Sequence, residues 1–163
     1  MKKLISIISI ILVLLIGGGW VAKIAIYPID FKDDIKKYSK EYNIDPSILA
    51  SLINFETRFE KKDYEAGKSN GILNMRDDFA KDLANKAGIK NFDPKTLANP
   101  EVSIKLGAFF ISQYKTTEKM VMNWTIRSEE EERKELMKDY SQKYYVPKIE
   151  KRAKIYKILN PGL

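Results

Sequence analysis

The chain has 163 residues, a net charge of +7 at neutral pH, and neither histidine nor cysteine. The absence of both residue types excludes disulfides, thiol nucleophiles, zinc–thiolate centres and histidine-based catalysis, so any catalysis must use carboxylates, hydroxyls or lysines. The length suits one compact domain with a short additional segment, and the 44% of hydrophobic residues is sufficient for a core. The basic balance suits an anionic partner such as a wall polymer, a membrane surface or nucleic acid, and it equally suits solubility alone.

The N-terminal segment is apolar. Lys2 and Lys3 precede an uncharged run from Leu4 to Ala22, which is close to the ~20 residues that a membrane-spanning helix needs. The two lysines predict a cytoplasmic start, with the rest of the chain outside the cytoplasm. We interpret residues 1–26 as an uncleaved single-pass anchor in the cell membrane. A cleaved signal peptide, which would leave a secreted protein, is the alternative.

Residues 27–163 are predicted to form one all-α domain, because apolar residues recur at helical spacing and no useful length of sequence alternates like a strand. Asp45-Pro46 is a good helix start, since aspartate caps helices and proline suits the first helical position. The predicted helices cover 31–43, 46–58, 77–87, a stretch from 99 onward, 118–126 and a last helix opening at Pro147. A long loop is expected over 60–77, and the highly charged segment 127–143 is expected to be a solvated helix or mobile.

Glu56 is an unusual residue in this pattern. It follows Leu52 by four residues and Ile53 by three, so it shares their apolar helix face. Phe55 and Phe59 are expected to flank it and make its surroundings apolar. Burial among apolar groups and a position near a helix C-terminus both favour the protonated carboxyl, which is the form that protonates a glycosidic oxygen. The alternative is a structural role, in which Glu56 pairs with a lysine at the domain edge.

Several segments match one known pattern. These are Tyr27-Pro28, the turn at 43–46, the helix end Glu56-Thr57-Arg58-Phe59, and the helix start over 99–107. Residues 27–117 resemble the catalytic domain of lytic transglycosylases of the soluble, goose-lysozyme-like type. The resemblance implies a lysozyme-like helical fold behind the N-terminal helix, with Glu56 as the single catalytic acid/base.

The resemblance also implies roles for other residues. Supporting roles fall on Thr57 and on Tyr145, whose family counterpart hydrogen-bonds the acid, and substrate-binding roles fall on Glu65, Asn74, Met75 and Trp124, the last as a platform for a sugar ring. Asn74 stands where the family has glutamine, and Glu65 is counted to the place of a substrate-orienting serine. Residues 122–127 replace an Ala-Tyr-Asn-Ala-Gly segment of the family and lack its glycine.

The implied function is that of a peptidoglycan lytic transglycosylase, which cleaves the β-1,4 bond between N-acetylmuramic acid (MurNAc) and N-acetylglucosamine (GlcNAc) and leaves 1,6-anhydro-MurNAc ends. It needs no metal and no cofactor, and its partners would be glycan strands, the membrane and proteins of a membrane complex. The lost glycine favours an alternative, a catalytically degenerate wall-binding or scaffold domain. Glu65 facing Glu56 would favour hydrolysis instead. A helical membrane protein unrelated to sugar is a further alternative. Nucleic-acid binding is disfavoured by the predicted location and by the acidic run at 129–132.

Overall fold

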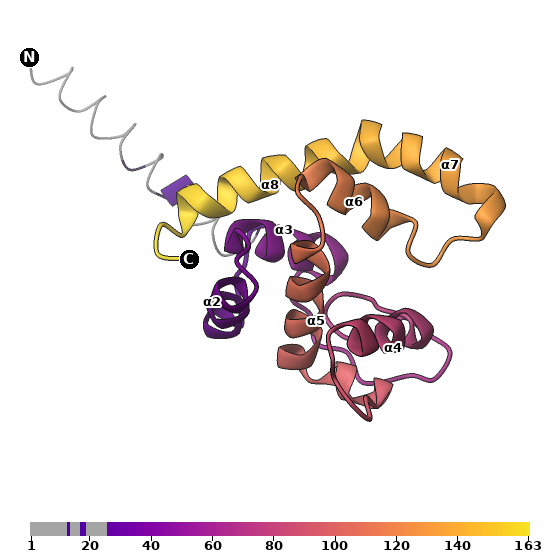
Figure 1. The fold of residues 1–163 in the computed structure, drawn as a ribbon. Helices are drawn as coiled ribbons and strands as arrows, with labels where there is room; N and C mark the ends of the chain where they lie inside the picture. Colours follow the sequence, from indigo (N-terminus) through magenta and orange to yellow (C-terminus); the bar gives the residue numbers. More distant parts are fainter. Residues whose placement is uncertain (1–12, 14–16, 19–25) are drawn as a thin grey trace, which may run out of the picture.

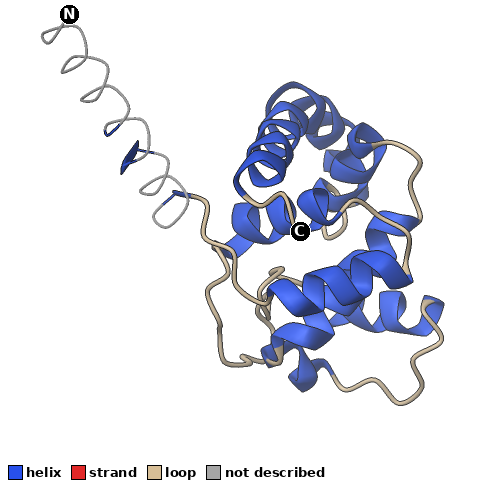
Figure 2. Cartoon of the chain, turned by 90° about the vertical axis from the view of Figure 1, so that its left-hand side faces the viewer, coloured by secondary structure: helices blue, strands red, loops and turns tan. Residues whose placement is uncertain are grey.

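The computed structural model describes Val13, residues 17–18 and residues 26–163. The predicted anchor or signal over residues 1–26 lies almost wholly outside these described residues, and it stays a prediction. In the described part of the chain, no helix is long and apolar enough to cross a membrane. This part consists of helices and connecting loops without a strand (Figure 2), which confirms the all-α class.

The helices follow one another along the chain as α2 (Lys32–Glu41), α3 (Pro46–Thr57), α4 (Asp77–Lys86), α5 (Pro100–Ser112), α6 (Thr117–Thr125), α7 (Glu131–Tyr140) and α8 (Val146–Leu159). A short 3-10 helix, η2 (Pro94–Ala98), precedes α5, and a π-helical turn, η3 (Ser141–Tyr145), joins α7 to α8. Where the sequence predicts a start or an end for a helix up to residue 126, the observed bound lies within one or two residues of it.

The prediction of a last helix that opens at Pro147 agrees with α8, which begins one residue earlier, at Val146. The sequence does not predict that this helix continues directly from α7. Helical backbone runs from α7 through η3 into α8 without a break, and Pro147 lies one residue inside α8. Proline has no N–H to donate and its ring disturbs the preceding helical turn, which usually ends or bends a helix. The wide turn of η3 comes directly before the proline and changes the hydrogen-bond pattern there, so the helix continues.

Helix α3 lies between the other helices, with α8 above it and α5 below it in Figure 1. It starts where the sequence predicts, since the Asp45 side chain accepts a hydrogen bond from the backbone N–H of Ser47 at 2.9 Å. It ends at Arg58 and Phe59, whose φ angles of 56° and 68° turn the chain out of the helix. Glu56 therefore stands on the last turn of the most enclosed helix.

The predicted loop after α3 is present, and it is held in one shape by Asn70. The Asn70 side chain accepts from the Glu65 N–H at 2.8 Å and donates to the Glu65 carbonyl at 3.0 Å, while its backbone pairs with Met75. Gly71 has a φ of 69°, and a Cβ there would lie 2.5 Å from the Leu97 carbonyl oxygen and closer still to the Ser103 hydroxyl. The loop therefore packs against the start of α5, and glycine is required at this point.

Helix α7 differs from the others because none of its residues is buried. The charged segment was expected to be a solvated helix or mobile, and the structure has the first of these. In Figure 1, α7 extends away from α4 and α5, beyond the end of α6. One wall of the candidate site thus comes from an element that contributes nothing to the core.

Candidate active site

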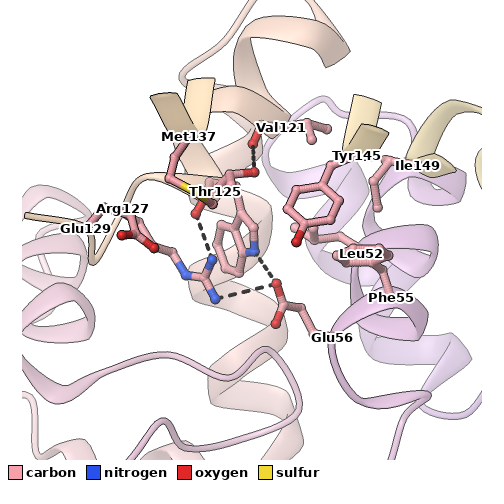
Figure 3. Close-up of a pocket in the computed structure, with 11 residues that line it drawn as sticks. Leu52, Phe55, Glu56, Val121, Thr125, Arg127, Glu129, Met137, Tyr145 and Ile149 are labelled. Atoms are coloured by element: carbon pink, nitrogen blue, oxygen red, sulfur yellow. Dashed lines mark hydrogen bonds and ion pairs between the residues drawn. The ribbon is translucent and has the colours of Figure 1, made fainter. Parts of the chain in front are cut away.

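A pocket of about 250 Å³ opens beside Glu56 (Figure 3). Its first wall is α3, which contributes Leu52, Phe55 and Glu56. Its other walls come from α6 and the segment after it, from α7, and from the junction of η3 with α8. The pocket therefore lies between the helix that carries the predicted acid and the region where the sequence departs from the family pattern.

The Glu56 carboxylate is surrounded by N–H donors. Its Oε1 accepts a hydrogen bond from Trp124 Nε1 at 2.6 Å and lies 3.4 Å from Arg127 Nη2, while its Oε2 accepts from Asn74 Nδ2 at 3.3 Å. Only 12% of the side chain is exposed. The three donors come from three different parts of the chain, and together they fix the orientation of the carboxylate.

The expectation of apolar surroundings for Glu56 is therefore wrong in part. Phe55 does line the pocket beside it, but Phe59 lies in the core, where its ring packs against Tyr156. Because Arg58 and Phe59 both take left-handed backbone angles, the helical spacing that would place Phe59 near Glu56 no longer applies. Polar groups from the loop and from α6 take up the space that the helix pattern assigned to phenylalanine.

Arg127 is fixed by more contacts than its ion pair. Its Nη1 donates to the Trp124 carbonyl at 2.7 Å, its Nη2 donates to the Asn74 carbonyl at 3.1 Å, and its Cζ lies 4.1 Å from the centre of the Trp124 ring. Its side chain is 13% exposed. Burial lowers the pKa of the Arg127 guanidinium and the charge of Glu56 opposes that shift, yet arginine stays cationic near neutral pH. The two residues form a sheltered ion pair.

Asn74 and Thr57 hold the loop against the end of α3. Asn74 has a left-handed backbone with a φ of 47°, which asparagine tolerates, and its side chain also donates to the Glu56 carbonyl at 2.9 Å. The buried Thr57 hydroxyl donates to the Ile72 carbonyl at 2.7 Å. Both residues thus help to position the backbone that carries Glu56.

Tyr145, at the end of η3, lines the same pocket. Its ring packs edge-on against Phe55 of α3 at a centroid distance of 5.2 Å. Among the described residues its hydroxyl makes no hydrogen bond to Glu56. The structure therefore brings Tyr145 to the pocket but does not show the hydrogen bond that the resemblance implies.

Three other predicted site residues lie elsewhere or face differently. Glu65 is exposed on the loop and does not line the pocket, whose second carboxylate is Glu129. Met75 is fully buried in the core, because its pairing with Asn70 turns it inward. Trp124 borders the pocket but is only 2% exposed, so its ring cannot serve as an open platform for a sugar in this structure.

The packing around Trp124 explains that burial. Phe79 from α4 and Phe110 from α5 meet its ring edge-on, at centroid distances of 5.8 and 5.1 Å, and the Arg127 guanidinium also lies over the ring. The indole N–H is left pointing at Glu56. The tryptophan therefore positions the carboxylate rather than offering a ring face.

Sequence reasoning missed Arg127 as a site residue. The signal that could have found it is its place in segment 122–127, which lacks the family's glycine. Arg127, three positions after Trp124, brings a long cationic side chain to a segment where the family has a residue without a side chain. In the part of the chain that the structure describes, no group of three or more acidic side chains could hold a metal ion.

An all-helical domain with a sheltered glutamate at the end of its central helix has the features of a lysozyme-like fold. The family model described as Transglycosylase SLT domain matches residues 33–137, which is more than half of the chain. The chain therefore belongs to the SLT transglycosylase domain family. The comparison with curated proteins finds no match.

Proposed function

We propose that this protein is a peptidoglycan lytic transglycosylase that cleaves the MurNAc–GlcNAc β-1,4 bond and forms 1,6-anhydro-MurNAc ends, with Glu56 as its acid/base. The observation that supports this most is the sheltered Glu56 carboxylate, which lies in the segment matched by the SLT family model and borders a pocket. The domain would be residues 27–163, held outside the cytoplasm at the cell membrane by residues 1–26, with glycan strands and proteins of a membrane complex as partners.

One carboxylate suffices for this chemistry. Protonated Glu56 gives its proton to the oxygen that joins C1 of MurNAc to GlcNAc, and the C1–oxygen bond breaks. The C6 hydroxyl oxygen of the same MurNAc then bonds to C1, and its proton returns to the Glu56 carboxylate. No water is consumed, and holding the hydroxyl near C1 provides much of the rate gain.

The remaining site residues act through position. The side-chain amide of Asn74 donates to the Glu56 carboxylate and orients it. The same amide also donates to the backbone carbonyl of Glu56. Thr57 hydrogen-bonds the loop and so holds it at the end of α3, and Tyr145 lines the pocket. Since Glu65 does not line the pocket, a hydrolytic mechanism with Glu65 as the base has no support here.

A second function is favoured by a specific contact. The ion pair between Arg127 and Glu56 stabilises the ionised carboxylate, whereas a general acid must carry a proton. A wall-binding or scaffold domain of a membrane-associated complex, with Glu56 kept for structure, would tolerate such a pair permanently.

The two functions are separated by the products. We would incubate the full chain, purified in detergent, with purified peptidoglycan and determine the masses of the released fragments by mass spectrometry. A transglycosylase releases anhydromuramoyl fragments, which are lighter by one water than the products of hydrolysis. A binding domain releases nothing soluble and sediments with the wall.

A further inference from the structure

Arg127 occupies a position where its charge opposes the proposed reaction. Its guanidinium points at Glu56 (Figure 3) and favours the ionised carboxylate, which cannot donate a proton. In addition, glycoside cleavage builds positive charge on the sugar ring at the bond being broken. A cation beside that ring destabilises the transition state unless an anion neutralises it. Cleavage at Glu56 therefore requires that Arg127 first give up its contact with the carboxylate.

Arg127 cannot simply release Glu56 and stay in place. Its side chain is 13% exposed, and a buried charge without a counter-ion is strongly unfavourable. Its release thus depends on a replacement anion within reach. The guanidinium must exchange one carboxylate for another.

The guanidinium is suited to such an exchange. Arginine binds a carboxylate best through two parallel hydrogen bonds, as along the edge formed by Nε and one Nη. In the resting arrangement Nη2 reaches Glu56 at only 3.4 Å, and Nε is buried with no hydrogen-bond partner in the described part of the chain. A second carboxylate could satisfy both nitrogens, which Glu56 does not.

Two sources of that carboxylate can be named. Glu129 lines the pocket with Glu56, but it already lies 3.5 Å from Arg133 and would have to leave that partner. The other source is the substrate. MurNAc carries a lactyl ether on C3, on the same ring whose C1 bond would be cleaved. Its carboxyl group is ionised when the stem peptide is absent and is a neutral amide when the peptide is attached.

We propose that Arg127 transfers from Glu56 to the free lactyl carboxylate of MurNAc, so that this site selects glycan from which the stem peptides have been removed. The proposal rests on the proposed function for the identity of the ligand. It makes Arg127 a specificity-determining and positioning residue, since it binds the substrate carboxylate and thereby allows Glu56 to take up a proton.

The test compares two short MurNAc–GlcNAc oligosaccharides that differ only at the lactyl group, one with the carboxylate and one with its N-methylamide. Binding to the full chain in detergent is measured by calorimetry or by NMR shifts. We expect wild type to bind the carboxylate form about tenfold more tightly, as for one well-placed charged contact. Arg127→Gln should bind both forms equally, with an affinity near that of wild type for the amide.

A matched control is Lys86→Ala, which removes the cation of an exposed ion pair on α4 and should keep the preference. Equal binding of the two oligosaccharides by wild type overturns the proposal, as does a failure to bind either, or a preference that survives in Arg127→Gln. Equal binding is also the result expected if Arg127 moves to Glu129 instead. If Arg127→Gln fails to fold, equal binding of the two oligosaccharides by wild type still overturns the proposal.

This readout is independent of cleavage. If no glycan yields anhydromuramoyl ends but the carboxylate preference is present, the proposed activity fails and the role of Arg127 stands. If intact and peptide-stripped peptidoglycan are cleaved equally well and the preference is absent, the activity stands and the role of Arg127 fails.

Discussion

The two sides of the pocket differ in origin. The side built from α3 follows the family pattern at Glu56-Thr57, and the loop that carries Asn74 packs against the end of this helix. The opposite side, residues 122–127, departs from that pattern and supplies Trp124 and Arg127. The first side positions the backbone of the predicted acid, and the second surrounds its side chain with an indole N–H and a cation. The backbone of Glu56 is thus placed by one part of the molecule, while two of the three donors to its carboxylate come from another.

The largest effect on stability is expected on the side that follows the family pattern. Gly71→Ala places a Cβ against the Leu97 carbonyl and the Ser103 hydroxyl at a backbone φ of 69°. The strain and the overpacking together should lower the free energy of unfolding by about 2–4 kcal/mol. Urea denaturation measures this loss.

Gly67→Ala is the matched control, because its φ of 76° is similar but nothing lies within 4 Å of an added Cβ. It should cost only the conformational strain, about 1 kcal/mol. Equal losses for the two variants would show that the loop does not pack tightly against α5.

The next effect tests the opposite side through the ion pair. We expect a double-mutant cycle with Glu56→Gln and Arg127→Gln to give a coupling energy of about 1–3 kcal/mol at neutral pH, since both side chains are mostly buried. Chemical denaturation of the four proteins provides the values. A coupling near zero would mean that the pair contributes nothing, and that Arg127 is not held by Glu56.

How far the sequence predicts this site depends on the distance in the chain between the partners. Asp45 and Pro46 act on their own neighbours, so the start of α3 and the place of Glu56 on its face follow from local rules. The contacts of Glu56 with Trp124 and Arg127 join residues 68 and 71 positions apart. Helical spacing carries no information about such pairs, and only the tertiary fold, which brings Trp124 and Arg127 to the end of α3, creates them.

Rules based on local sequence also fail where the backbone makes a turn that the side chains do not specify. Pro147 predicts the start of α8 to within a residue, but it does not predict the π turn of η3 that joins α8 to α7. Phe59 predicts an apolar neighbour for Glu56, but the left-handed residues at 58 and 59 direct it into the core. In both cases a single backbone turn, which no side-chain pattern specifies, decides how the chain continues.

A smaller effect is expected from Trp124→Phe. This change keeps an aromatic ring between Phe79 and Phe110 and removes only the N–H that donates to Glu56 at 2.6 Å. The free energy of unfolding should fall by about 1–2 kcal/mol at neutral pH, as for one hydrogen bond to a charged group. Thermal unfolding followed by circular dichroism measures it, and Phe110→Leu, which changes the packing without touching the carboxylate, is the comparison. If Trp124→Phe shows no loss of stability, the hydrogen bond from the indole N–H to Glu56 does not contribute to the free energy of unfolding.

The smallest effect concerns the other end of α3. Burial tends to raise the pKa of Asp45, but hydrogen bonds from Lys157 and Ser47 outweigh it and lower that pKa below its ordinary value. A carboxyl with a lowered folded-state pKa contributes stability above its unfolded pKa, about 3.9, and that contribution is lost as the pH falls through the folded value.

The stability difference between wild type and Asp45→Asn should therefore be present at pH 7 and shrink below about pH 4. Melting temperatures across this range test the sign. A difference that grows toward acid pH would contradict it. Because this pair is largely exposed, its effect should be smaller than that of the sheltered pair at Glu56.

The most direct measurement is a digestion of purified peptidoglycan by the full chain and by Glu56→Gln, with the released fragments identified by mass and both proteins shown to be folded by circular dichroism. Anhydromuramoyl fragments from wild type and none from Glu56→Gln are the predicted result, and they would assign the acid. Fragments from both proteins would contradict the role of Glu56. No fragments from either, with both sedimenting with the wall, would contradict the enzyme and favour the binding domain.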